Sequence, residues 1–441
     1  IFDPLYPPSV SVTTPRLRTY NDIPEYTILS MYAEDKISGV LFKPFTLQMG
    51  VRYEVYRPSG INFKGLIGQA DFIESKNGSF LNPRLTFSMN ITENTQIRLG
   101  YGVTSKAPPL GMIFAQDKYY DVIDTVSVVN PQYPDSNFSL VSTFIKQQAN
   151  PEIKGYTQKK YEISIDQQFE FFGVSVTGYV NNTKGMFQGF SEPMIYYKRA
   201  FPNWPDESGA FITRTYLETY SKYANDGWQK VEGLEASFTT KRIPVINTVV
   251  KIDAAYTNSE SGTTNGYSIS SSRYVAALNT DVMPVYLTHE SYYRDLLINY
   301  RFEIQAKTLG IWLTLHIQQK LMEIDGRRNY DAVYPIGYYS ATGGMTWIPE
   351  NERTDIKYEA IRRTVYAYDL YEEVKPNKWL FNLKVSKSLW KGAAVSFYVN
   401  NFFNNQPLYQ RQRSSAVSPV YDRRNPGIFY GIDFSTAIDV K

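Results

Sequence analysis

Apolar and polar residues alternate along most of this chain. The stretch 159–182, KKYEISIDQQFEFFGVSVTGYVNN, places Tyr161, Ile163 and Ile165 between polar neighbours, and the alternation resumes with Val174 and Val176 after a break. Successive side chains of a β-strand point to opposite sides of a sheet. A period of two therefore predicts a strand with one apolar and one polar face.

The same period recurs in many other segments. Apolar positions at helical spacing are nearly absent, so the chain is predicted to be all-β, with about 13 strands long enough to cross a bilayer. These strands are expected near residues 26–36, 45–57, 80–92, 95–106, 159–170, 172–189, 227–242, 247–259, 293–307, 309–325, 377–390, 392–405 and 428–440. The strand-like segment 211–224 is expected to be a hairpin or a strand extension inside a long loop.

The connections between these strands alternate between short and long. The short ones lie around residues 93–94, 171–172, 307–308 and 390–392, whereas the long ones cover 59–79, 107–158, 191–227 and 326–376. Short periplasmic turns and long extracellular loops give this alternation in outer-membrane barrels, and a compact soluble domain seldom contains so many long connections. The pattern predicts a transmembrane antiparallel β-barrel.

Charged residues on the polar side of the predicted strands agree with a barrel whose polar face lines the lumen. A soluble core would have to pair every one of these charges. The alternative is a soluble or surface-anchored β-rich adhesin whose polar face is a solvated outer surface. The residues expected to face the lumen are Arg52, Arg84, Arg98, Glu162, Asp166, Glu235, Arg301, Glu303 and Lys384.

Composition restricts the chemistry. The 441 residues include no cysteine and two histidines, and the formal net charge is +3. Disulfides and cysteine-based metal sites are excluded, and nothing points to nucleic acid as a partner. His316 lies on a polar strand face and His289 in a loop, neither within a recognisable catalytic arrangement. We expect no enzyme activity, no metal site and no cofactor.

The number of strands bears on domain organisation. Bacterial single-chain barrels usually close with an even number of strands. Because the expected number is odd and the chain starts at Ile1 without a signal peptide, we expect further strands upstream. Residues 1–441 are thus interpreted as the C-terminal portion of a larger barrel.

Several segments resemble consecutive strands of TonB-dependent outer-membrane transporters. They are FTLQMGVRYEVY (45–56), FLNPRLTFSMNITENTQIRLGYGVTSKAPPL (80–110), NPEIKGYTQKKYEISIDQQF (150–169), VEGLEASF (231–238), FNLKVSKSLWKGAAVSFYVNNFFNNQPLY (381–409) and NPGIFYGIDFSTAIDV (425–440). Their order and spacing cover nearly the whole chain. The end departs from the family, whose barrels commonly finish on an aromatic residue, because this chain finishes with Asp439, Val440 and Lys441.

The resemblance implies a 22-stranded barrel closed by a plug domain of the same polypeptide, which is not present in this sequence. It also implies coupling to TonB of the inner-membrane energy complex and a location in the outer membrane of a Gram-negative cell. Membrane lipid and lipopolysaccharide are then expected partners, and a surface lipoprotein is a further candidate partner. The lumen-facing charges would hold the plug.

Aromatic and basic residues in the long loops are the candidates for ligand binding. Aromatic rings offer large rigid surfaces above a barrel mouth, and arginine suits anionic groups. Lipopolysaccharide phosphates are an alternative partner for the arginines. The candidates are Tyr119, Tyr120, Tyr196, Tyr197, Trp204, Tyr338, Tyr339, Trp347, Arg411 and Arg413.

The expected function is TonB-dependent uptake of a scarce or large nutrient such as a ferric siderophore or another chelate. Cobalamin, a glycan or a peptide remains open as the substrate. A passive or secretion channel without a plug is the alternative within membranes, and the adhesin is the alternative outside them.

Overall fold

The computed structural model describes residues 12–13, 21, 23–68, 71–126, 139–200, 212–328, 332–342, 344–390, 392–414 and 418–436. Almost all of the regular structure is β. No helix within these residues has the length and apolar character needed to cross a bilayer.

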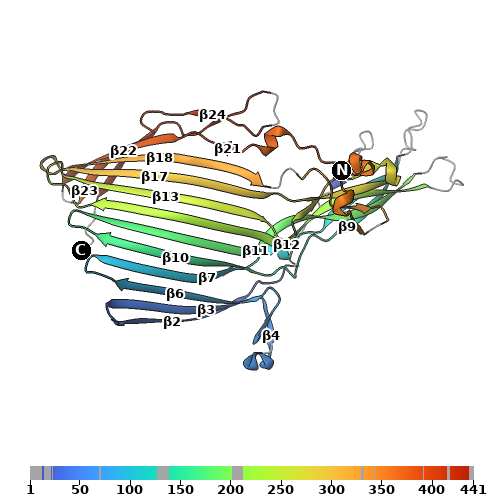
Figure 1. Cartoon of the computed structure of the whole chain (residues 1–441), viewed down its shortest axis with the longest axis horizontal. Coiled ribbons are helices and arrows are strands. Elements are labelled where there is room, and N and C mark those ends of the chain that lie inside the picture. Colours follow the sequence, from blue (N-terminus) through green and yellow to red (C-terminus); the bar gives the residue numbers. More distant parts are fainter. Residues whose placement is uncertain are drawn as a thin grey trace.

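One large antiparallel sheet dominates the molecule (Figure 1). Thirteen strands follow one another in chain order, and the short strand β21 (Glu373–Val374) pairs with the side of β18. The all-β prediction and the expected number of strands are confirmed. The strands are β2 (Ile28–Val40), β3 (Pro44–Tyr56), β6 (Ser79–Asn90), β7 (Thr95–Lys106), β10 (Tyr156–Gln168), β11 (Phe172–Ala200), β12 (Ile212–Thr240), β13 (Thr248–Thr263), β17 (Glu290–Ala306), β18 (Ile311–Arg328), β22 (Lys378–Trp390), β23 (Ala393–Asn400) and β26 (Phe429–Thr436).

The hairpin of β11 and β12 is the longest feature of this sheet. Each strand has 29 residues, and Ala200 pairs with Ile212 at the far end. The segment 211–224 was expected to extend a strand within a loop, and residues 212–224 do so as the first part of β12. The pairing shifts register around Met186, where Gly185 has a φ of 71° that favours glycine. The two bulges bend the hairpin where it leaves the main sheet.

The tight turns all lie at one end of the sheet, and the long connections lie at the other (Figure 1). One tight turn is the 3-10 segment η4 (Lys307–Leu309), which joins β17 to β18. It ends at Gly310, whose φ of 61° lets its N–H reach the Lys307 carbonyl. The strict alternation of turn lengths is therefore a property of the structure.

The long connections fold into small sheets and short helical turns. One sheet joins β1, β8 and β9, another joins β14, β15, β16, β19 and β20, and two hairpins pair β4 with β5 and β24 with β25. Their bounds are β1 (Val12–Thr13), β4 (Pro58–Ile61), η1 (Phe63–Ile67), β5 (Ile73–Ser75), α1 (Leu110–Ile113), β8 (Lys118–Val126), β9 (Ser139–Lys146), β14 (Tyr267–Ile269), β15 (Arg273–Val275), η3 (Ala276–Leu278), β16 (Thr280–Leu287), β19 (Gly337–Ser340), β20 (Met345–Trp347), η5 (Glu350–Glu352), η6 (Ile356–Ile361), η7 (Ala367–Leu370), β24 (Leu408–Gln410) and β25 (Tyr421–Arg423).

Buried apolar clusters lie in these loop structures. One cluster centres on Val275, Val282 and Ile361, and the other on Val122 and Met194. The loops therefore form packed, folded caps at one end of the strands.

The main sheet instead leaves its apolar face open. Leu99, Ile163 and Leu234 belong to one row that runs across β7, β10, β11 and β12, and they are 45%, 52% and 52% exposed. Burying a leucine of this size would stabilise a soluble protein by about 1.5–3 kcal/mol. A continuous exposed apolar row is instead the pattern of a sheet that faces lipid.

Candidate functional site

The charged residues predicted to line the lumen all lie on the other face of the sheet. Strand register shows this directly, because Arg98 pairs with Ser164, Thr177 pairs with Glu235, and Lys251 pairs with Arg301. Following these pairings from strand to strand gives one common side. The residues on it are Arg52, Arg84, Arg98, Glu162, Asp166, Glu235, Arg301, Glu303 and Lys384.

Many of these charges form pairs along the polar face. The Nε atom of Arg98 lies 2.9 Å from Oδ2 of Asp166, whose other oxygen accepts a 2.6 Å hydrogen bond from Ser175. Arg301 lies 2.8 Å from Glu303. Solvent-exposed ion pairs of this kind contribute about 0–1 kcal/mol each to stability. The charged side chains of the polar face can therefore leave these pairs and bind other groups at little cost in free energy.

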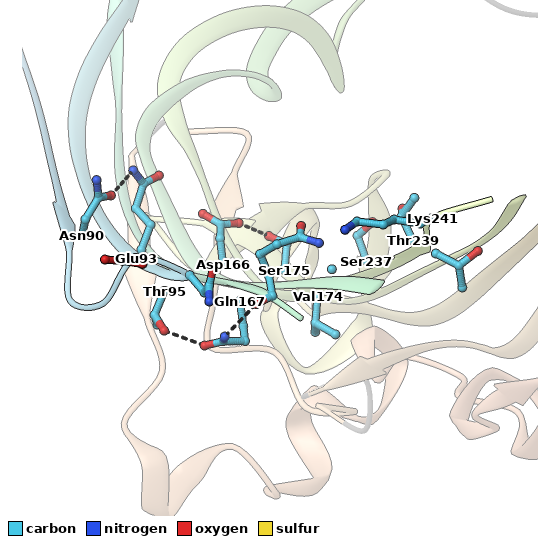
Figure 2. Close-up of a pocket in the computed structure, with 15 residues that line it drawn as sticks. Asn90, Glu93, Thr95, Asp166, Gln167, Val174, Ser175, Ser237, Thr239 and Lys241 are labelled. Carbon is cyan, nitrogen blue, oxygen red and sulfur yellow. Dashed lines mark hydrogen bonds between the residues drawn. The ribbon is translucent and has the colours of Figure 1, made fainter. Parts of the chain in front are cut away.

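A polar hollow of about 790 Å³ lies on this face near the tight turns (Figure 2). Asp166, Ser175 and Ser237 line it, with Lys241 at its edge. Hydroxyl, amide and charged groups dominate its wall, which suits contact with another polar protein surface better than with an apolar molecule.

At the loop end, an ionic network fastens two connections to the polar side of β18. Glu323 lies 2.7 Å from Lys375 and 2.9 Å from Arg424. Arg413 forms an ion pair with Asp325 and lies 3.6 Å from Glu373. These ion pairs thus hold the connection after β23 and the segment around β21 to each other and to the loop end of β18.

Glu373 is the buried centre of this network. Its carboxylate accepts hydrogen bonds from the Tyr409 hydroxyl and from the backbone N–H groups of Gln412 and Arg413, at 2.8 and 3.0 Å for the latter two. Burial alone would raise the pKa of this carboxyl, but the hydrogen bonds outweigh burial and lower the pKa. Burial, followed by the hydrogen bond to Glu373, raises the pKa of Tyr409.

Next to this network lie two adjoining hollows of about 590 and 310 Å³, which share Ser261 and Ser291. We call them together the mouth hollow. Its wall combines serine hydroxyls and aromatic rings with cationic and ionisable side chains. The ionisable groups are Asp226, His289, Asp325, Arg327, Arg363 and Arg413.

Both acids of the mouth hollow already have partners. Asp226 accepts a 2.8 Å hydrogen bond from the backbone N–H of Asn265, and Asp325 is paired with Arg413. The Arg363 guanidinium lies 4.2 Å above the ring of Tyr286. Burial, followed by the charges of Arg327, Arg363 and Arg413, lowers the pKa of His289. The hollow therefore carries an excess of positive charge and suits an anionic ligand.

The predicted ligand-binding aromatics are distributed among different surroundings. Tyr120 and Tyr196 are buried in the cluster around Met194, and Tyr338 packs against the cluster around Val275. Tyr119 and Tyr339 are half-buried, and Trp204 lies outside the described residues.

The two remaining predicted aromatics are exposed. Tyr197 contacts Phe144 edge to face, with 5.3 Å between ring centres. Trp347 is 58% exposed and makes an edge contact at 5.9 Å with Tyr267, a residue of the mouth hollow. Trp347 therefore does not line the mouth hollow itself but contacts Tyr267, which does.

The two predicted arginines also differ. Arg413 lines the mouth hollow, whereas Arg411 forms an exposed bidentate pair with Asp422, at 2.6 and 2.9 Å. His289 and Tyr267 were not expected from the sequence to bind a ligand, whereas Arg363 is one of the basic loop residues that were considered for an anionic substrate. Tyr267 and His289 lie in the connection between β13 and β17, whereas Arg363 lies in the connection between β18 and β22, and no spacing along the chain relates the two connections.

An apolar face left open, a charged opposite face and folded loops at one end define the wall of a transmembrane β-barrel. The sequence matches the family model described as TonB dependent receptor-like, beta-barrel, over residues 1–402. The chain belongs to this family, as the resemblance predicted. Its members are transporters, which agrees with the expectation that the chain is not an enzyme.

Solved structures of siderophore receptors are similar to the chain at low identity. A variant of the ferric enterobactin receptor from Pseudomonas aeruginosa matches with 15% identity and a TM-score of 0.49, covering 93% of this chain and 45% of that one. A siderophore receptor from Acinetobacter baumannii matches with 12% identity and a TM-score of 0.43, covering 93% and 55%. The chain thus spans about half the length of these proteins. No curated protein matches the sequence.

Among the described residues, no group of three or more His, Asp or Glu side chains is placed to hold a metal ion.

Proposed function

We propose that this chain is the C-terminal portion of an outer-membrane receptor barrel that takes up an anionic ferric chelate. A plug domain elsewhere in the same polypeptide would close the lumen, and TonB would supply the energy. Membership of the receptor family supports uptake, and the apolar face of the sheet supports a position in the outer membrane.

The observation that carries the ligand class is the positive mouth hollow on the polar side of the sheet. Arg327, Arg363 and Arg413 meet there beside a half-buried histidine. Guanidinium groups bind carboxylate or phenolate oxygens strongly when water is partly excluded. A ligand held there would lie at the entrance to the lumen.

The lumen charges would then hold the plug. Arg98, Asp166 and their neighbours present pairs that are individually weak, so a plug could be sealed by many contacts and still be displaced by a pull. The polar hollow near the tight turns offers a further surface for it.

A binding experiment with the full-length protein tests the ligand class. Ferric catecholate, ferric hydroxamate, cobalamin, an oligosaccharide and a peptide are titrated in turn. We expect one ferric chelate to bind, and we expect Arg363→Gln to weaken it about tenfold or more.

The neighbouring Arg362→Gln is the matched control, because Arg362 pairs with Glu359 at 3.3 Å and does not line the hollow. Equal affinities for the two variants would contradict the proposed site. Binding of the oligosaccharide or peptide alone would contradict the chelate. Uptake that continues without TonB would favour a passive channel.

A further inference from the structure

The outward face of the sheet begins to carry charged residues on the loop side of the apolar row. The row through Ile163, Leu234 and Leu296 is apolar. Two residues further along each strand the row contains Glu232 and Arg294, which lie on the same outward side. At about 3.3 Å per residue, this change takes place within roughly 7 Å.

Aromatic rings mark this boundary. Tyr101 and Tyr161 face outward on β7 and β10 with 5.1 Å between their ring centres. Tyrosines of this kind concentrate at the level where a bilayer changes from hydrocarbon to headgroup. The charged rows therefore lie at the level of the headgroups.

We call the outward-facing rows that carry charged residues on β10, β11, β12, β13, β17 and β18 the outer rim. Its cations outnumber its carboxylates, and it runs across strands that lie side by side (Figure 1). The cations are Lys159, Lys184, Lys230, Arg294 and Arg328, and the carboxylates are Glu232, Glu260 and Glu290.

Two guanidinium groups of the outer rim converge on one ring. Those of Arg294 and Arg328 lie 5.1 and 5.4 Å from the centre of Tyr292. The Tyr292 hydroxyl donates a 2.5 Å hydrogen bond to Glu372, which fixes the ring. Arg294 donates to Asn258 at 3.2 Å, and Arg328 lies 2.8 Å from Glu260. Two positive charges are thus held near each other, with donors left over for a further anion.

From this geometry we infer that the outer rim binds the phosphate groups of the outer-leaflet glycolipid, with Arg294 and Arg328 as its principal ligands. A phosphorylated lipid matches both halves of the surface, because its acyl chains lie along the exposed apolar row while its phosphates reach the arginine forks. A free phosphate would match the charges alone. The inference rests on the proposed position of the apolar face in the membrane.

The test uses the full-length protein in vesicles that contain bisphosphorylated or dephosphorylated lipid A, with lipid retention measured by native mass spectrometry. The expected result is preferential retention of the phosphorylated lipid. Loss of one arginine is expected to weaken retention about fivefold, and R294Q/R328Q more than that.

The matched control is R98Q/R301Q, which removes two arginines from the opposite, lumen-facing side of the same sheet and is expected to leave lipid retention unchanged. Heat-modifiable gel mobility confirms that each variant is folded. Equal retention of both lipids, or equal loss in both double variants, would overturn the inference. So would displacement of the lipid by millimolar inorganic phosphate, which would identify a free-anion site.

Insertion into vesicles is measured separately by flotation. A protein that inserts but does not distinguish the two lipids refutes phosphate binding by the outer rim and leaves the proposed membrane position intact. A protein that does not insert refutes the proposed membrane position.

Discussion

The hydroxyl of Tyr409 on β24 donates a hydrogen bond to the buried carboxylate of Glu373 on β21. This contact joins two connections that are separate in sequence and fastens both to the loop end of β18. The same carboxylate also accepts hydrogen bonds from two backbone N–H groups. The Glu373 side chain therefore holds in place the loop that carries Arg413, a residue of the mouth hollow.

Glu373→Gln is therefore expected to loosen the segment 408–414. An amide has one acceptor oxygen, so at least one of the three donors loses its partner, at a cost of about 1–3 kcal/mol. Faster amide hydrogen exchange in this segment is the readout. Glu359→Gln, which alters an exposed pair, is the control. Unchanged exchange in Glu373→Gln would show that the carboxylate does not hold the loop.

Acid should have the same effect on this loop. The pKa of Glu373 is lowered in the folded protein, so its contribution to stability is complete above the unfolded value of about 4.3. That contribution is lost as the pH falls through the lower folded pKa. We expect the protection factors of amides in 408–414, which correct for the intrinsic pH dependence of exchange, to fall below about pH 4 in the wild type and to depend less on pH in Glu373→Gln. Parallel pH profiles would contradict this assignment.

His289 reports on the charge of the mouth hollow. Burial and nearby arginines lower its pKa, so NMR titration should place it below about 6.5. The unfolded chain then binds the proton more readily, and the stability contributed by neutral His289 is present above about pH 6.5 and lost as the pH falls. An anionic ligand in the hollow should raise this pKa.

Assignment of the signal is simple, because the sequence has one other histidine, His316. The His289→Phe variant removes the signal of interest and leaves that of His316 as an internal control. A His289 pKa that does not respond when the ferric chelate binds would argue against binding in the mouth hollow.

Met194 lies at the centre of the cluster that holds the β11–β12 hairpin against β8 and β9, and it is fully buried. Met194→Ala should destabilise this packing by about 2–5 kcal/mol. The adjacent Ile195→Ala, at a position that is 39% exposed, should cost far less. Protease cleavage within the hairpin distinguishes them, and equal cleavage rates would contradict the packed arrangement.

The strands could be predicted from the sequence because the barrel wall obeys a simple rule. Each residue of a strand faces either lipid or lumen, so the alternation of Ile163 with Ser164 records the structure directly. The same rule placed Arg98 and Glu235 on one side although they are far apart in the chain.

The mouth hollow could not be predicted in this way. His289, Arg363 and Tyr267 meet because two connections pair in one small sheet, where Met283 of β16 lies opposite Tyr339 of β19. No periodicity relates such loops, and their pairing depends on tertiary contacts. Aromatic content alone did not separate Tyr196, which packs in a core, from Trp347, which is exposed.

The central claim is that the apolar face of the sheet contacts hydrocarbon while the opposite face lines the lumen. Leu234 and Glu235 are neighbours on β12 that point to the two faces, so arginine at each position compares them directly. The free energy of unfolding from lipid vesicles is measured for both variants of the full-length protein. The account predicts a loss of about 2–4 kcal/mol for Leu234→Arg and less than about 1 kcal/mol for Glu235→Arg. Equal losses, or a larger loss for Glu235→Arg, would contradict it.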